Sequence, residues 1–257
     1  MSELFNSLTN KQGLVSFGGV ASTDYGMVVS EAASFDSPTR KQTIYTVPGR
    51  NGSIIKQEKA WNDVTRQYRI WIDEQTEFDS GDQIVRGTLA ERVRNLMAWL
   101  NSKDGYQRLE DNFDPDVYRL AYYSGGNELA NKLTLVGEGT LTFTCKPQRF
   151  LKSGEDPVEV VNSDVLKNPT LFDAKPLIHI EGTGNITIGT GGKTLTITGL
   201  ADYINIDCER MDSYRLPAEN KNSMVSGQFI ELVPGNNTIA ITGTATKVTI
   251  TPNYFSI

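Results

Sequence analysis

Few side chains in this chain could do chemistry. His179 is the single histidine and Cys145 and Cys208 are the only cysteines, too few to predict a zinc site. A Ser/His/Asp triad would have to recruit His179, yet the nucleophile motif G-x-S-x-G is absent. His179 alternates with Ile178 and Ile180 in LIHIEG, which predicts a surface position for the imidazole. We therefore predict no enzyme: no catalytic residue, no metal ligand and no cofactor.

Two further motifs resemble ligand sites only in part. GTGGKT, residues 189–194, would need glycine at position 187 to be a phosphate-binding loop, but Thr187 stands there. A strand pattern, LTITG, follows it where a helix is required, so we predict a hairpin turn. The acidic segments at 73–82 and 109–118 lack the ligand spacing of a calcium loop and predict solvated turns.

Composition excludes several classes of partner. The 25 basic and 31 acidic residues give a net charge of −6 and a pI near 5.0. This balance argues against direct nucleic-acid binding and against attraction to anionic membranes. No apolar run approaches the roughly 18 residues of a transmembrane helix, and the first residues lack the apolar centre of a signal peptide. We therefore expect a globular protein without membrane insertion.

The first 150 residues predict a sheet with one amphipathic helix. Apolar side chains alternate through VTRQYRIWI (64–72) and through LTFTC (141–145), as in half-buried strands. Thr88 and Glu91 have the spacing of a capping box, and apolar residues then follow a helical repeat toward Gly105. We expect Cys145 here, and Cys208 further on, to be buried free thiols, because each ends the apolar side of a strand.

A sharp reversal is predicted at VPGRNG (47–52), which combines Pro-Gly and Asn-Gly. Basic and aromatic residues surround this turn, a pattern found both in nucleic-acid patches and in protein interfaces. Nearby acidic residues favour the protein interface, where arginine and aromatic side chains are enriched. The predicted interface residues are Arg40, Arg50 and Trp61.

The later part of the chain predicts a sandwich or jelly roll. Alternating apolar pairs separated by turn residues give six or seven short strands and no helix. A loop-like stretch at 209–223 carries four side chains suited to contact with a protein more than with a sugar: Met211, Tyr214, Arg215 and Leu216. The region contains no tryptophan for stacking on a pyranose.

A domain boundary is expected near residue 150. Ten of the twelve arginines and all three tryptophans precede it. The stretch 152–169 is polar and carries prolines at positions 157 and 169, as linkers often do. We predict domains at 1–151 and 170–257, joined by a linker at 152–169.

Several segments of the first part resemble the N-terminal domain of distal tail proteins (Dit) of long-tailed, non-contractile phages. They are FGGVASTDYGMVVS (17–30), SPTRKQTIYTVPGRNGSI (37–54), the helical region 89–126 and GTLTFTCKPQRFL (139–151), in this order and spacing. The Thr- and Ile-rich second part resembles the galectin-like C-terminal domain of the same family. The implied fold is mainly β: a sandwich-like N-terminal domain with one helix, then a galectin-like sandwich.

The resemblance implies a structural role in the virion. Dit proteins form a homo-hexameric hub at the distal end of the tail, made in the host cytoplasm, and DNA passes through its channel. Their partners are the tail-tube protein, the tip protein or fibre, and receptor-binding or other baseplate proteins. Two alternatives stay open, a tail-tube subunit and a carbohydrate-binding module for host recognition.

Overall fold

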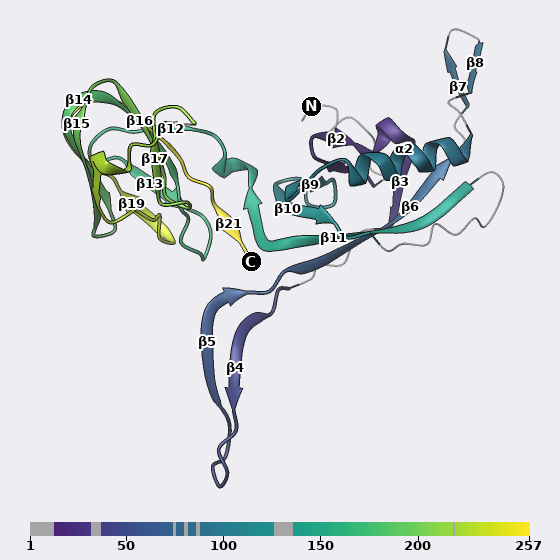
Figure 1. Ribbon diagram of the computed structural model, residues 1–257, viewed down its shortest axis with the longest axis horizontal. Helices are drawn as coiled ribbons and strands as arrows, with labels where there is room; N and C mark the ends of the chain where they lie inside the picture. Colours follow the sequence, from purple (N-terminus) through teal and green to yellow (C-terminus); the bar gives the residue numbers. More distant parts are fainter. Residues whose placement is uncertain are drawn as a thin grey trace. The chain divides into compact units, whose positions relative to one another are not determined.

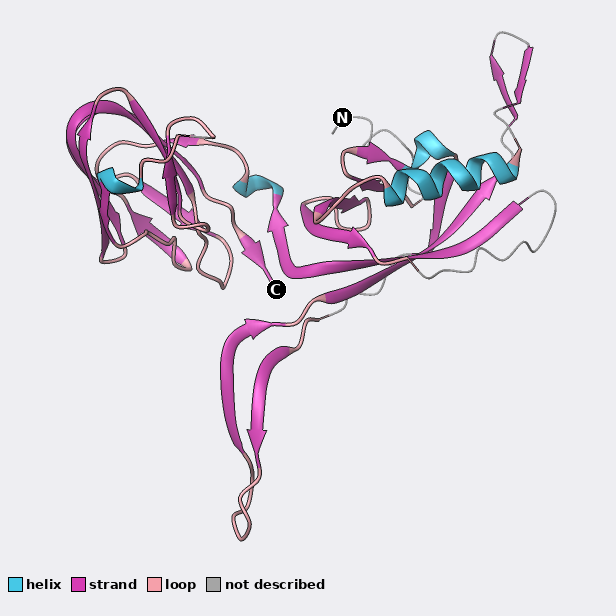
Figure 2. Ribbon diagram, in the orientation of Figure 1, coloured by secondary structure: helices cyan, strands magenta, loops and turns pink. Residues whose placement is uncertain are grey.

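The computed structural model describes residues 13–31, 37–73, 76–79, 82–85, 88–125, 136–217 and 219–257. The chain divides into two compact units, Met1–Arg149 with Ile257, and Phe150–Ser256. Strands dominate both units, and the described residues contain a single α-helix (Figure 2). The prediction of a mainly β protein with one helix is therefore confirmed.

One large sheet and the helix build the first unit (Figure 1). The sheet has the strand order β2-β1-β9-β10-β11-β6-β3, and two hairpins, β4–β5 and β7–β8, form separate two-stranded sheets. A short 3-10 helix, η1, spans Ser22–Tyr25. The strands are β1 (Val15–Phe17), β2 (Val20–Ala21), β3 (Met27–Glu31), β4 (Arg40–Tyr45), β5 (Ile54–Trp61), β6 (Val64–Asp73), β7 (Thr76–Asp79), β8 (Asp82–Val85), β9 (Gln107–Asp111), β10 (Val117–Tyr123) and β11 (Val136–Leu151).

The alternating segments form the predicted strands. β6 pairs with β11 from Val64 opposite Cys145 to Asp73 opposite Val136. Their inward side chains are buried, as the period of two predicts. The prediction of a turn at 73–82 is wrong for Thr76–Asp79, which form β7 and pair with β8. The segment 109–118 contains the predicted turn, but its two ends belong to β9 and β10, and Asp111 is buried.

Helix α2 (Leu89–Asn101) packs on the inward face of this sheet through Leu96, Trp99 and Leu100. Its capping box is confirmed: the Glu91 N–H donates to Thr88 Oγ1 (3.4 Å), and Glu91 Oε2 accepts from the Thr88 N–H (2.8 Å). The helix ends at Asn101 rather than near Gly105, because Ser102 already caps it by donating to the Trp99 carbonyl.

The second unit is a sandwich with a core of isoleucine, leucine and valine. Its main sheet has the order β12-β20-β14-β15-β18, and β14 also pairs with β16, which pairs with β17. A second sheet pairs β13 with β19. The elements are η2 (Lys152–Gly154), β12 (Val158–Glu159), β13 (Val165–Asn168), β14 (Leu177–Thr190), β15 (Lys193–Leu200), β16 (Tyr203–Asp207), β17 (Asp212–Tyr214), η3 (Asn222–Met224), β18 (Val225–Gly227), β19 (Gly235–Thr238), β20 (Ala240–Thr251) and β21 (Phe255–Ser256).

The expected linker at 152–169 is wrong. Its strands β12 and β13 pair with β20 and β19, and its side chains Val160 and Leu166 are buried in the core of the second unit. Each pairing partner follows about 70 to 90 residues later in the chain, so the polar local sequence did not reveal it.

Two glycine features shape the second unit. Gly191 and Gly192, both with positive φ, form the two-residue turn between β14 and β15, so the prediction that GTGGKT is a hairpin turn is confirmed. Gly243 has φ 97°, and a Cβ there would lie 2.2 Å from the Asn185 carbonyl oxygen. β20 therefore approaches β14 closely only because position 243 lacks a side chain.

Candidate interaction surfaces

Among the elements of the first unit whose side chains the structure describes, the β4–β5 hairpin, residues 40–61, is the most exposed, and it stands clear of the sheet (Figure 1). The chain reverses at its tip, where the Arg50 N–H donates to the Val47 carbonyl (3.2 Å) across Pro48 and Gly49. Gly49 has φ 77°, as the second central position of a type II turn requires. The predicted sharp reversal at VPGRNG is confirmed.

Apolar side chains are exposed on both faces of this hairpin. Ile44 lies opposite Ile55 and Tyr45 opposite Ile54, and successive pairs point to opposite faces. Ile44 is 56% exposed and Tyr45 51% exposed. A two-stranded ribbon buries too little surface to be stable by itself in water, and exposed apolar clusters mark sites of association. The hairpin therefore has the surface of a binding element.

The three predicted interface residues all belong to this hairpin. Arg40 and Trp61 pair across the strands at its base, with the Arg40 guanidinium carbon 4.3 Å from the centre of the Trp61 ring. Arg50 lies in the turn at the other end, separated from Arg40 by a strand rising roughly 3.3 Å per residue. The structure thus brings Arg40 and Trp61 together and places Arg50 apart from them.

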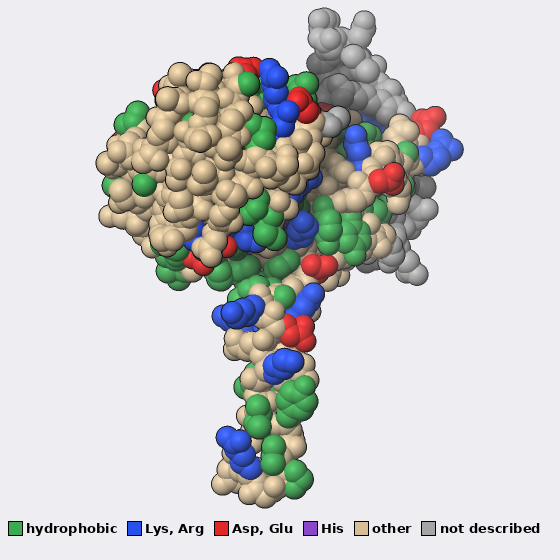
Figure 3. Space-filling view, turned by 60° about the vertical axis from the view of Figure 1, so that its left-hand side comes forward, with side chains coloured by type: hydrophobic (Ala, Val, Ile, Leu, Met, Phe, Trp, Pro, Cys, Tyr) green, Lys and Arg blue, Asp and Glu red, His purple; other side chains and the backbone are tan. Residues whose placement is uncertain are grey.

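The hairpin is cationic in an acidic protein. Five basic side chains and one acidic side chain give residues 40–61 a net charge of +4, so the rest of the chain carries −10. Basic and hydrophobic side chains alternate along the hairpin (Figure 3). The hairpin therefore has the opposite net charge to the remainder of the chain.

A second surface was predicted at 209–223 in the second unit. This stretch is less loop-like than expected, because β17 lies inside it and its Tyr214 pairs with Asn205 of β16. Met211 and Leu216 are exposed, one residue before and two residues after β17. Arg215 is held by an ion pair with Asp202.

Polar and aromatic side chains meet beside this strand. The Arg215 guanidinium carbon lies 5.2 Å from the Tyr203 ring centre, and the His179 ring centre lies 5.4 Å from it. His179 Nδ1 and Asn205 Oδ1 are 2.8 Å apart, and the Asn205 amide donates to the Arg215 carbonyl. These groups thus satisfy one another in a partly exposed network. His179 is 35% exposed, so its predicted surface position is borne out.

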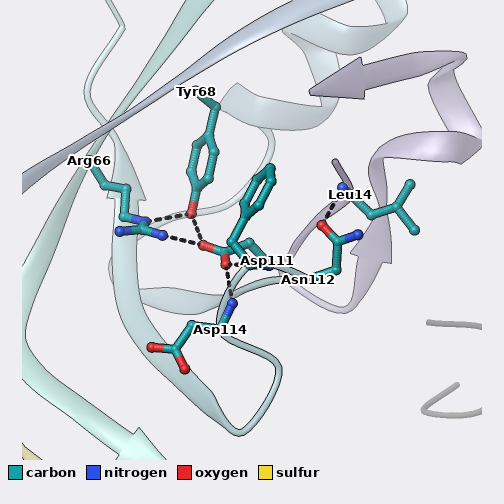
Figure 4. Close-up of polar contacts among 7 residues, drawn as sticks. Leu14, Arg66, Tyr68, Asp111, Asn112 and Asp114 are labelled. Atoms are coloured by element: carbon teal, nitrogen blue, oxygen red, sulfur yellow. Dashed lines mark hydrogen bonds and ion pairs between the residues drawn. The ribbon is translucent and has the colours of Figure 1, made fainter. Parts of the chain in front are cut away.

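Sequence reasoning missed a buried polar network in the first unit (Figure 4). Arg66 is 2% exposed and Asp111 6% exposed, and Arg66 Nη2 lies 2.7 Å from Asp111 Oδ2. The Tyr68 hydroxyl accepts from Arg66 Nε (3.0 Å) and donates to Asp111 Oδ2 (2.7 Å). Arg66 lies two residues from both Val64 and Tyr68, so the alternation of the strand places all three on the inward face. This alternation was the sequence signal that could have revealed the network.

Burial and charge together set the ionisation of this network. Burial alone would lower the pKa of Arg66, but its interactions with Tyr68 and Asp111 outweigh that effect and raise it. Burial, helped by the Asp111 carboxylate, raises the pKa of Tyr68 well above its usual range. The network is therefore a charged pair with a neutral phenol, an arrangement that holds β6 to the end of β9.

The two thiols are free and buried, as predicted. Burial raises the pKa of Cys145 to about 11 and that of Cys208 to about 12, so neither is a nucleophile near neutral pH. Within the described residues, no cluster of three His, Cys, Asp or Glu side chains is arranged to hold a metal ion. No helix in the described part of the chain is long and apolar enough to cross a membrane.

No family model and no curated protein matches this sequence. The structure is nevertheless similar to the crystal structure of SPP1 Dit (gp 19.1), a paradigm of the hub adsorption apparatus in phages that infect Gram-positive bacteria. The TM-score is 0.71 at 17% sequence identity, over 95% of this chain and 99% of that chain. Both units take part in the likeness, so the predicted Dit-like architecture is confirmed at the level of the fold. This chain has a Dit-like fold along nearly its whole length.

Proposed function

We propose that this protein is a structural component of a phage virion, the hub at the distal end of the tail. Six copies form a closed ring that joins the tail-tube protein to the tip protein or fibre, and DNA passes through the opening without being bound. The role requires no catalysis and no cofactor, and synthesis takes place in the host cytoplasm. The supporting observation is the likeness to a hub protein that spans both units of this chain.

The β4–β5 hairpin is the contact between neighbouring copies. It exposes apolar pairs on both faces, which a monomer leaves in water. Its net charge of +4 complements the −10 of the remaining chain. A hairpin of one copy on a different surface of the next is a heterologous contact, and such contacts close into rings when the rotation allows.

Assembly of the purified full chain tests this role. Light scattering and negative-stain microscopy should find discrete rings or pairs of rings at high concentration, or after addition of tail-tube protein. Long cylinders formed by this chain alone would support the tail-tube alternative. A strict monomer under all these conditions would contradict the hub.

Variants of the hairpin separate assembly from folding. Ile44→Ser/Ile55→Ser should abolish rings and leave the unfolding of the monomer almost unchanged, because both side chains are exposed. Arg50→Ala should weaken each contact by about 1–3 kcal/mol, as a buried arginine anchor would. Leu171→Ser in the second unit removes another exposed side chain and is the matched control. Unchanged rings in the Ile44/Ile55 variant would exclude the hairpin.

The second unit serves as an adapter for peripheral proteins, with Met211, Tyr214, Arg215 and Leu216 at the contact. Arg215 and Tyr203 are already engaged with each other, which leaves this face without a free aromatic platform between them. A glycan array probed with the full chain should therefore be blank. Reproducible binding that Tyr214→Ala abolishes would support the carbohydrate-binding alternative instead.

A further inference from the structure

A pocket opens at the base of the β4–β5 hairpin, between the chain segments that enter and leave it. Its described lining consists of residues 37–39 before β4, residues 63–65 leading from β5 into β6, and Gln67 of β6. The cavity has a volume of about 450 Å³, within the range of roughly 300–1,000 Å³ that is typical of ligand sites. It is therefore large enough to receive a side chain from another molecule.

The lining of this base pocket combines an apolar part with side chains that carry oxygen. Pro38 and Val64 are buried, whereas the polar lining residues are exposed. Asp63 is the one ionisable side chain among the lining residues that the structure describes. Hydroxyl, amide and carboxylate oxygens accept hydrogen bonds, and the carboxylate adds a negative charge. The pocket thus suits a cation that has several N–H donors and an apolar stem, as an arginine side chain does.

The Asp63 carboxylate has acceptor capacity left for such a ligand. Its Oδ2 accepts from the Tyr106 hydroxyl at 3.4 Å, which is long for a hydrogen bond between oxygens. The described residues make no other hydrogen bond and no ion pair with this carboxylate. Lys146 lies over the Tyr106 ring, 5.0 Å from its centre, and does not pair with Asp63. Since a carboxylate has about four acceptor sites, Asp63 can accept two N–H groups of one guanidinium.

Arg50 is a matching cation at the opposite end of the same hairpin. Its backbone N–H closes the turn at the tip, and its guanidinium makes no hydrogen bond, ion pair or ring contact with the described residues. A Cβ added at Gly49 or Gly52 would meet nothing within 4 Å. The backbone on both sides of Arg50 is therefore narrow and surrounded by open space, so the tip can approach another surface closely.

Arg50 cannot reach the pocket of its own copy. Eleven positions separate Thr39 in the pocket from Arg50 at the tip, along an extended hairpin (Figure 1). At roughly 3.3 Å per residue, the two ends of the hairpin lie roughly 30 Å apart. An arginine side chain spans only a small part of this distance, so a tip and a pocket meet only when they belong to different copies.

We infer that the base pocket of one copy binds Arg50 from the hairpin tip of a neighbouring copy. Asp63 pairs with the guanidinium, and Gln67 and the hydroxyl groups of the lining accept its remaining N–H groups. Tip and pocket are different surfaces, and each copy has one of each, so the contact is heterologous and repeats from copy to copy. The inference rests on the proposed ring and names the surface that receives the hairpin there.

Charge reversal at either end of the contact tests it, under the conditions in which the unaltered chain forms rings. Arg50→Glu and Asp63→Arg should each weaken self-association at least about 30-fold, because each change places like charges together. An equal mixture of the two variants should regain assembly, since every tip can then meet a pocket of opposite charge. Sedimentation velocity measures the assembly, and native mass spectrometry should find both variants in equal numbers within each ring. Lys56→Glu changes the charge of the hairpin as Arg50→Glu does, but away from the tip, and as the matched control it should still assemble.

Unchanged assembly of either variant alone, or a mixture that stays unassembled, would overturn this contact and leave the hub role intact as long as the unaltered chain forms rings. A loss confined to Asp63→Arg would show that the pocket binds a cation other than Arg50. An unaltered chain that never assembles would contradict the hub and this contact together. Tryptophan fluorescence checks that each variant is folded, because all three tryptophans lie in the first unit. Should Asp63→Arg fail to fold, Gln67→Arg, also exposed in the pocket lining, replaces it in the mixture.

Discussion

Replacing Asp111 by asparagine should destabilise the first unit more than any surface change. The substitution keeps the size of the side chain but removes the negative charge beside Arg66, which is almost completely buried. It also creates a conflict between donors. Asp111 accepts on both oxygens, from Arg66 and Tyr68 on one and from two backbone N–H groups on the other. Either orientation of the asparagine amide therefore points an N–H at another N–H.

The expected loss is about 3–5 kcal/mol, the range observed when one partner of a buried ion pair is removed. A domain is usually stable by only about 5–15 kcal/mol, so the variant should be marginally folded. The double variant Arg66→Met/Asp111→Asn should be less unstable than the sum of its single changes, since it leaves no buried cation unpaired. A coupling free energy of at least about 1 kcal/mol is expected.

Urea unfolding followed by tryptophan fluorescence measures this effect, because Trp61, Trp71 and Trp99 all lie in the first unit. The midpoint should fall with little change in slope. Asp114→Asn is the control, since Asp114 contributes its backbone N–H to the network, and it should stay within about 0.5 kcal/mol of the original chain. A loss below about 1 kcal/mol for Asp111→Asn would refute the view that this pair anchors β6 to β9.

Three further outcomes are expected. Thr88→Ala removes the capping box of α2 and should reduce the stability of the first unit by about 1 kcal/mol in the same urea assay, and an unchanged midpoint would contradict the role of the cap. Gly243→Ala should destabilise the second unit by roughly 3 kcal/mol, measured by unfolding followed by circular dichroism, because its Cβ would meet the Asn185 carbonyl. Gly235→Ala is the control: this glycine also has a positive φ but faces open space, so the variant should lose clearly less stability. Folding raises the pKa of Cys145 from 9.0 to about 11, so the folded state favours the neutral thiol. The stability gained from this shift is complete below about pH 9 and is lost as the pH rises toward 11. Cys145→Ala should therefore show a shallower loss of stability between pH 9 and pH 11.

Local patterns in the sequence were sufficient to predict the buried face of a strand, the start of the helix and the tight turns. The alternation through 64–72 predicted which face of β6 is buried, and the spacing of Thr88 and Glu91 predicted where α2 begins. The Pro-Gly turn of the hairpin and the two-glycine turn after β14 were also predictable. In each case the deciding interaction connects residues close together in the chain, so its signal lies within one short segment.

The errors concern residues whose partners are distant in sequence. The segment 152–169 was expected to be a linker because it is polar, yet β12 and β13 complete the sheets of the second unit. The alternation of apolar residues through 64–72 did not by itself predict that Arg66 is buried, because a charged residue is rarely buried without a partner. That partner, Asp111, lies 45 residues later, at the end of β9. The candidate interface was predicted from residue types alone. That prediction did not say that Arg40 and Trp61 lie together at the base of the hairpin and Arg50 at its tip.

The sequence by itself determined the fold class, the buried faces of the strands, the helix start, the tight turns and the lack of a catalytic motif. These features depend on the side-chain period and on backbone preferences, which act over a few residues. Only the tertiary structure decided that Arg66, Tyr68 and Asp111 form one network, that Arg119 is buried beside it, and that the hairpin exposes apolar pairs on both faces. These features depend on which distant strands pair and in which register, and burial and charge compensation exist only after that pairing has formed.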